Sequence, residues 1–336
     1  MGRRIASPER PRVDSTPRID GGTALVFAGT GAPAAYFGAG AVQALEEAGQ
    51  RPRVVSGVST GAINAYALGA GLDASALARM WSRIGWSDLY RPRADLWRAV
   101  NVGRLLRPNT NPAEYLLDAV GWTWLLDPAP TRRTLTRYLG PLPITPPPDL
   151  VVVLPAVDEV TGRVVRFCSR LPPRRRRDPW FRQVDLTADH VLASAAMPLL
   201  MRPSADDRHP LVDAGLVAGR PLAPVMRYEP DRVVVVSGAA ATRAAGHSLG
   251  AAIALLADAV TRSAVAADLD HAHTVNRLVR AAPAATVKRY VPVLLVEPAD
   301  VDAPAGGLLT FTAAHARRMI EYGRERAAAA LAAWQP

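Results

Sequence analysis

Two serines of the chain lie in the pattern Gly-x-Ser-x-Gly, which can present a nucleophilic serine at a sharp turn between a strand and a helix. The first pattern is GVSTG at residues 57–61, and the second is GHSLG at residues 246–250. The apolar run RVVS enters the first motif, and the helical pattern AINAYALGAG follows it directly. Residues 238–245 separate the second motif from the strand before it, so Ser248 also fits the start of a helix. The context favours Ser59 as the nucleophile and keeps Ser248 as the alternative.

A serine nucleophile needs a general base, for which the chain offers histidines and carboxylates. None of the six histidines lies in a glycine-rich loop or before a strong turn, and His271 and His273 fit a helix surface. Asp213 instead follows apolar residues and precedes the small Ala214 and Gly215, which let the backbone approach closely. Asp213 is therefore the candidate base, and an aspartate that only stabilises its own turn is the alternative. With one cysteine and no acidic residues spaced as ligands beside the histidines, no metal site is predicted.

The turn Gly29-Thr30-Gly31 joins a short apolar strand to a helical pattern that is expected to start at Pro33. Two successive turns of this kind in a parallel sheet meet at the carboxyl ends of the strands. The backbone N–H groups of residues 29–32 can then face Ser59, next to the positive end of the helix, and bind a developing oxyanion. A phosphate-binding turn or a simple tight connection is the alternative.

Taken together, these stretches resemble the patatin-like phospholipases, a family of serine acyl hydrolases. The resemblance covers residues 23–237 and includes two supporting stretches, AYFGAGAVQALEEAG after the glycine turn and ASAAMPLL at 193–200. It implies an α/β fold with three α/β/α layers, a mainly parallel central sheet and a helical cap insertion. It also implies a Ser–Asp dyad without a catalytic histidine. Ser59 would attack the acyl carbonyl and Asp213 would take the serine proton.

The resemblance also implies how the glycines act. The oxyanion hole would be formed by Gly29, Thr30, Gly31 and Ala32, and the motifs would be supported by Gly57, Gly61 and Gly215. The chain departs from the family pattern where Thr30 replaces a glycine, Pro33 a basic residue and Ala34 a further glycine. Because proline has no N–H, Pro33 cannot contribute to the hole.

The arrangement of elements predicts one domain over residues 21–336, preceded by a disordered basic tail over residues 1–20. Strands are expected at 23–28, 53–56, 150–154, 163–168, 232–237 and 290–296, and helices at 187–196, about 247–280 and 312–333. Residues from about 79 to 140 are rich in Arg and Trp and show no clear strand, so they are expected to form the helical cap insertion. Residues 238–336 are the C-terminal extension. No apolar run approaches the ~20 residues of a membrane-spanning helix.

The net charge of +10 predicts an anionic partner. No nucleic-acid-binding motif accompanies this charge, so an anionic membrane surface is the expected partner. The predicted contact residues are Arg174, Arg175, Arg176, Arg177, Trp180 and Phe181. A solvated run of charge is the alternative. The N-terminus matches no targeting signal, and a cytoplasmic, peripherally membrane-associated protein is expected.

The resemblance implies a phospholipase- or lysophospholipase-like hydrolase that cleaves a lipid or another acyl ester through an acyl-enzyme, without a cofactor. The tryptophans of the insertion could form the wall of an acyl-chain cleft or belong to the core. Two other functions share the same residues. An acyltransferase would pass the acyl group from Ser59 to another acceptor, and a weakly active homologue would only bind lipid.

Overall fold

A computed structural model describes most of the chain, namely residues 21–95, 123–141, 143–173, 176–205, 209–217, 219–239, 248–299, 304 and 306–336. Its centre is a sheet whose first strand, β1 (Thr23–Ala28), is bordered by β2 (Pro52–Gly57) and β10 (Arg232–Ser237), both parallel to it. The parallel order continues to β11 (Val293–Val296) on one side and β5 (Val151–Asp158) on the other. These strands are almost continuous runs of valine and other apolar residues, as expected where both faces of a sheet are covered.

Beyond β5 the sheet becomes mixed. The strand β6 (Val164–Cys168) pairs antiparallel with β5 and parallel with β7 (Phe181–Gln183). The short β9 (Pro210–Asp213) also pairs antiparallel with β5 and borders β8 (Ser204–Ala205). This pairing sets the end of β9, and with it Asp213, opposite Ala156 of β5.

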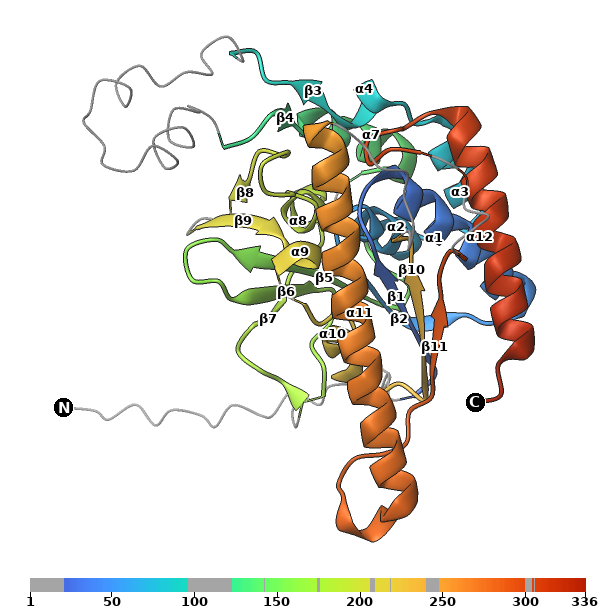
Figure 1. Ribbon diagram of the computed structural model, residues 1–336. Helices are drawn as coiled ribbons and strands as arrows, with labels where there is room; N and C mark the ends of the chain where they lie inside the picture. The colour runs from blue at the N-terminus through green and yellow to red at the C-terminus, as the bar shows by residue number, and fades with distance from the viewer. Residues whose placement is uncertain are drawn as a thin grey trace, which may run out of the picture.

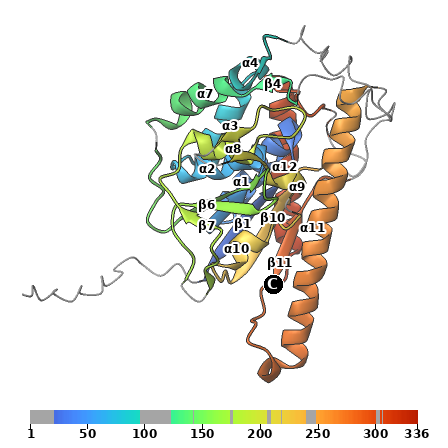
Figure 2. The same cartoon turned by 90° about the vertical axis from the view of Figure 1, so that its left-hand side faces the viewer.

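Helices cover both faces of the sheet (Figures 1 and 2), which gives the three layers that the resemblance implies. On one face, α1 (Gly31–Glu47) packs against α2 (Thr60–Gly69), α3 (Ala74–Arg83) and α12 (Ala313–Ala333). On the other face lie α10 (Ala223–Met226) and α11 (Leu249–Ala281), whose Val265 and Leu269 pack onto the sheet. The mainly parallel α/β fold class is thus confirmed.

The helix α11 is much longer than the sheet is tall and extends past its lower edge in Figure 1. By length and composition alone it is apolar enough to cross a membrane, which the sequence reading did not anticipate. In this structure it packs on the sheet instead and carries buried polar groups, among them Asp258, Thr261 and Asp268. A 3-10 turn, Pro283–Ala285, follows it.

The described part of the insertion departs from the helical expectation. It begins within α3 and includes the helices α4 (Trp86–Leu89) and α7 (Ala129–Leu139). Between α4 and α7, however, the short strands β3 (Arg91–Pro92) and β4 (Leu126–Asp127) form an antiparallel pair. Residues 96–122 and the N-terminal tail lie outside the described residues. Pairing of two-residue strands comes from a tertiary contact and leaves no periodic pattern in the sequence.

Candidate active site

Ser59 lies at the tight turn between β2 and α2, at the carboxyl end of the parallel strands. Its φ of 55° is positive, a strained value for a residue with a side chain, and the residue is 3% exposed. The flanking glycines make this turn possible: a Cβ on Gly57 would lie 2.1 Å from the Gly61 carbonyl oxygen, and one on Gly61 would lie 2.7 Å from Phe27 Cβ. The Ser59 amide donates to the Ser194 carbonyl at 3.0 Å, which holds the turn in place.

Asp213 ends β9 and is fully buried. Its amide donates to the Ala196 carbonyl at 3.0 Å, and its Oδ1 accepts from the Gly215 amide at 2.7 Å. Burial raises the pKa of this carboxyl to about 6, and hydrogen bonding from the Ser59 hydroxyl and the Gly215 amide opposes the rise. Within the described residues Oδ2 has no hydrogen bond of ordinary geometry, so this oxygen is the one that is available to accept a proton.

The glycine turn before α1 lies beside Ser59. Gly29 and Gly31 have φ values of 116° and 76°, and the Thr60 hydroxyl donates to the Gly31 carbonyl at 2.8 Å, which ties the turn to the start of α2. The sequence predicted that the helix α1 would begin at Pro33, but it begins at Gly31. The correction matters because the free N–H groups of the first turn start two residues earlier, at Gly31 and Ala32. Pro33 is then the third helical residue, where the missing N–H has no helical partner to lose.

One of these amides is engaged in the structure. The Ala32 N–H donates to the Leu308 carbonyl at 2.8 Å. Leu308 also packs closely on the turn, because a Cβ on Gly31 would lie 2.3 Å from the same carbonyl oxygen. An oxyanion therefore cannot accept from Ala32 until the backbone at Leu308 moves away. Sequence reasoning did not find Leu308, since no local pattern marks a residue far along the chain that contacts the turn.

Two buried polar residues join the helices behind the turns, and the sequence analysis did not single out this link. Asn64 of α2 is 0% exposed; its amide donates to the Ala35 carbonyl of α1 at 2.9 Å and accepts from Trp81 Nε1 at 2.6 Å. Trp81 also packs edge-to-face against Tyr36, with ring centroids 5.7 Å apart. Trp81 thus belongs to the core, one of the two roles considered for the tryptophans. The helix that follows Ser59 is thus fixed to the helix that follows the glycine turn.

The alternative serine has a different environment. Ser248 is exposed and precedes α11, and its Oγ accepts from the Ala251 amide at 3.1 Å, as a helix-capping serine does. His209 pairs with Asp158 at 2.7 Å, and the His190 ring bonds at the start of α8 (Ala188–Ser194). His315 is buried without a hydrogen-bond partner among the described residues.

The basic loop lies away from Ser59 and Asp213. Arg176 pairs with Glu229 at 2.8 Å, and the Glu229 carbonyl accepts from the Gly21 amide just before β1. The loop is therefore at the amino end of the parallel strands, whereas Ser59 follows the carboxyl end of β2. A six-residue strand separates these ends by ~20 Å. Arg174 and Arg175 lie outside the described residues.

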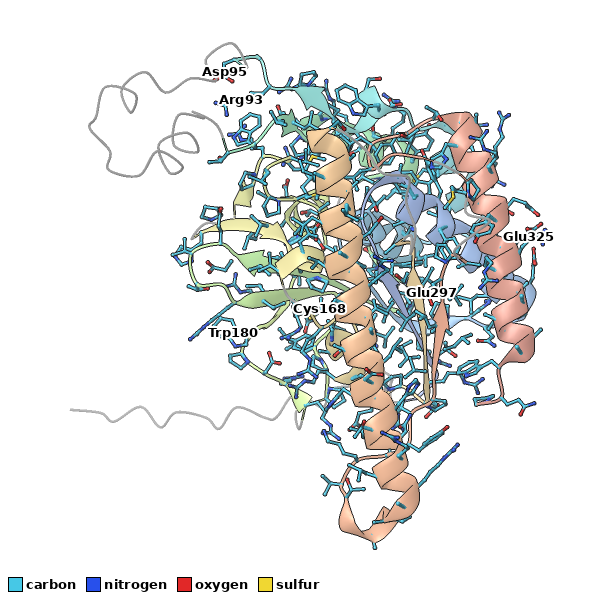
Figure 3. All side chains as sticks on the ribbon, viewed as in Figure 1. Arg93, Asp95, Cys168, Trp180, Glu297 and Glu325 are labelled. Atoms are coloured by element: carbon cyan, nitrogen blue, oxygen red, sulfur yellow. The ribbon has the colours of Figure 1, made fainter. Side chains whose placement is uncertain are left out.

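The aromatic residues of that prediction need a correction. Phe181 is 6% exposed and packs against Tyr228, so its ring is not available to a membrane surface. Trp180, at the β7 edge of the sheet in Figure 3, has the Arg163 guanidinium stacked 4.7 Å from its ring centre.

No group of three or more His, Cys, Asp and Glu residues within the described ranges is arranged to hold a metal ion. The site is thus built from a serine at a strained turn, a buried carboxylate beside it and a helix N-terminus. Such a set can support nucleophilic attack on a carbonyl, with proton transfer to the carboxylate and amide hydrogen bonds to the oxyanion.

Comparisons with known proteins identify the family. A search of curated proteins finds no match. Among solved structures, the chain is similar to VipD from Legionella pneumophila, with 14% identity, a TM-score of 0.40, and coverage of 94% of this chain and 67% of that one. It is also similar to the type III effector protein ExoU, with 16% identity and a TM-score of 0.35; the match covers 95% of this chain but only 53% of ExoU. The sequence model of the patatin-like phospholipases matches residues 25–226, more than half of the chain, which therefore belongs to this family of carboxylic ester hydrolases.

Proposed function

We propose that the protein hydrolyses lipid acyl esters through a Ser59–Asp213 dyad. Ser59 Oγ attacks the acyl carbonyl while Asp213 takes its proton, and Asp213 returns that proton to the leaving alcohol as an acyl-serine forms. Water then attacks the acyl-serine, which releases the fatty acid and restores Ser59. The observation that carries the proposal is the buried Asp213 carboxylate beside Ser59, with one oxygen bonded to Gly215 and the other without a partner among the described residues.

The surroundings of Asp213 suit a general base. With a pKa of about 6, the carboxylate is ionised at neutral pH and is a stronger base than an exposed aspartate. The Gly215 amide holds one oxygen and leaves the other for the serine proton. In this proposal no histidine bridges serine and carboxylate: Ser59 lies close enough to Asp213 for its hydroxyl to lower the pKa of that carboxyl.

The oxyanion donors in this proposal are the amides of residues 29–32 at the start of α1. The positive end of the helix adds to their effect. Because Ala32 donates to Leu308 in this structure, full use of the hole requires that the segment at Leu308 shift when substrate binds. The basic loop has no part in the proposal as a membrane contact, since it lies at the opposite end of the strands from Ser59.

The test is labelling by a fluorophosphonate probe, together with hydrolysis of a short-chain phospholipid. We expect the wild type and Ser248→Ala to be labelled and active, and Ser59→Ala to lose both properties. Asp213→Asn should lose hydrolysis, with circular dichroism confirming that it is folded. Labelling that persists in Ser59→Ala, or is lost in Ser248→Ala, would contradict the assignment.

A second arm separates hydrolysis from acyl transfer, which uses the same acyl-serine. The reaction is run with a short-chain alcohol present, and the products are analysed for free acid and for the new ester. Free acid as the main product supports the hydrolase. Predominant transfer to the alcohol would identify an acyltransferase while leaving the dyad assignment in place.

A further inference from the structure

A cavity of about 130 Å³ lies between the sheet and α11, directly beside the residues that flank the proposed dyad. Gly29 of the oxyanion turn, Val58 before Ser59 and Gly215 after Asp213 all line it. The far wall is formed by Thr261 and its neighbours on α11 and by Arg166 on β6. A group in this cavity would therefore be held next to an ester bound at Ser59.

Two lining residues carry buried polar atoms without partners. Thr261 is 4% exposed, and its Oγ1 has no hydrogen-bond partner within the described residues. The same holds for Nε of Arg166, although Nη1 of this guanidinium lies 3.3 Å from Asp178. A buried donor that is left unsatisfied is costly, and such atoms in one cavity mark the place of a missing acceptor.

The charge around Arg166 favours an anion as that acceptor. Arg166 and Arg227 both pair with Asp178, while Arg220, another lining residue, pairs with Asp268. In these contacts three guanidinium groups share two carboxylates, which leaves one positive charge in excess. Burial lowers the pKa of Arg166, and repulsion from Arg227 and Arg220 lowers it further.

The remaining lining is apolar and includes Val58, Pro155, Val164, Ala264 and Val265. This combination fits an anionic group on a short aliphatic stem better than a free inorganic ion, because the stem can cover the apolar walls. We infer that the cavity binds an anionic group, a phosphate or a carboxylate, carried by the substrate next to its scissile ester, with hydrogen bonds from Arg166 and Thr261. The inference rests on the proposed function, which it deepens by selecting anionic esters over neutral ones.

The test measures binding without turnover. Ser59→Ala protein is titrated calorimetrically with butyl phosphate, butyrate and butanol. We expect one or both anions to bind and butanol to bind at least tenfold more weakly. Binding of butyl phosphate alone points to a phosphate group, and binding of butyrate alone to a carboxylate. Absence of binding by both anions, or butanol binding as tightly as they do, overturns the inference.

Variants assign the effect to the cavity. In the Ser59→Ala background, Arg166→Gln should weaken anion binding by about 10- to 100-fold, the value of a charge-assisted hydrogen bond. Thr261→Val keeps the side-chain shape and should weaken it by about three- to tenfold. Arg163→Gln is the matched control, since Arg163 adjoins β6 and stacks on Trp180 but does not line the cavity. Equal affinities in Arg163→Gln, Thr261→Val and a folded Arg166→Gln would contradict the inference.

Kinetics separate a failure of this inference from a failure of the proposed function. The wild type is assayed on a neutral short-chain glycerol ester and on its phosphate-bearing and carboxylate-bearing counterparts. If Arg166→Gln lowers kcat/KM only for the charged esters, the inference is supported. If it lowers kcat/KM equally for all three, the inference fails while the hydrolase stands. If none of the three esters is hydrolysed in a Ser59-dependent way, the proposed function is refuted. The calorimetric titrations would still show whether the cavity binds an anion.

Discussion

Replacing the proposed base by its neutral isostere, Asp213→Asn, is expected to abolish turnover and at the same time to stabilise the protein at neutral pH. The carboxyl is 0% exposed, and burial raises its pKa from 3.8 to about 6. Between these values the folded state holds its proton while the unfolded chain releases it. The folded state therefore loses stability as the pH rises from about 4 to about 6.

The size of the effect follows from the same pKa values. Each pH unit between 3.8 and about 6 is worth 1.36 kcal/mol, so the ionised carboxylate costs about 3 kcal/mol once the pH exceeds both values. An asparagine has no such cost. It can keep the acceptor for the Gly215 amide and donate to Ser59 Oγ. We expect Asp213→Asn to be about 2–3 kcal/mol more stable than the wild type at pH 8, and only about 0.6 kcal/mol more stable at pH 4.

The assay is urea denaturation of both proteins at pH 4, 6 and 8, followed by circular dichroism. The difference between the two proteins isolates Asp213 from the other titrating groups. Ser59→Ala is the control: it is inactive too, but it retains the buried carboxylate, so its stability should still fall from pH 4 to pH 8. The fall should be at least as large as in the wild type, because the Ser59 hydroxyl that lowers the Asp213 pKa is gone. A difference that does not change with pH, or an Asp213→Asn protein less stable than the wild type at pH 8, would refute the reasoning about the buried carboxylate.

Three further predictions concern the active-site end and the basic loop. Because the base must be ionised, kcat/KM in a pH–rate profile should fall about tenfold per unit below the Asp213 pKa of about 6. Gly31→Ala should lower the free energy of unfolding by at least about 1–2 kcal/mol, as measured by urea titration, and should slow labelling by the fluorophosphonate probe. Gly31 has a φ of 76°, and an added Cβ would lie 2.3 Å from the Leu308 carbonyl oxygen. The double substitution Arg176→Gln and Arg177→Gln should leave hydrolysis of anionic vesicles unchanged, as measured by fatty-acid release; a clear loss would restore the membrane role of the loop.

The parts of the fold and site that could be predicted from the sequence are those set by neighbours along the chain. The turn at Ser59 depends on Gly57 and Gly61, so a five-residue pattern after an apolar strand is enough to indicate it. The order of strands and helices likewise follows from apolar runs and glycine turns. The helix boundary at Gly31 was displaced by two residues because proline fits any position of the first turn.

The contacts that the sequence did not indicate join distant segments. The carbonyl of Leu308 reaches the amide of Ala32, and Thr261 and Arg166 meet at one cavity from a helix and a strand far apart in the chain. The position of the basic loop is a second example. Its arginines suggested that it contacts an anionic membrane, but composition does not say where the loop lies; the pairing of Arg176 with Glu229 places it at the end of the strands opposite Ser59.

The destabilising features of the described structure gather where the proposed chemistry takes place. The positive φ of Ser59 costs about 1–3 kcal/mol, and the ionised Asp213 costs about as much again. Against a typical net stability of ~5–15 kcal/mol, these terms need a rigid support. Close helix packing provides it: a Cβ on Gly40 of α1 would lie 1.9 Å from the Ile320 carbonyl of α12. Since Asn64 then joins α2 to α1, the strained turn and the glycine turn are held against each other, and under the proposed function only the contact of Leu308 with the Ala32 amide has to open for that amide to bind an oxyanion.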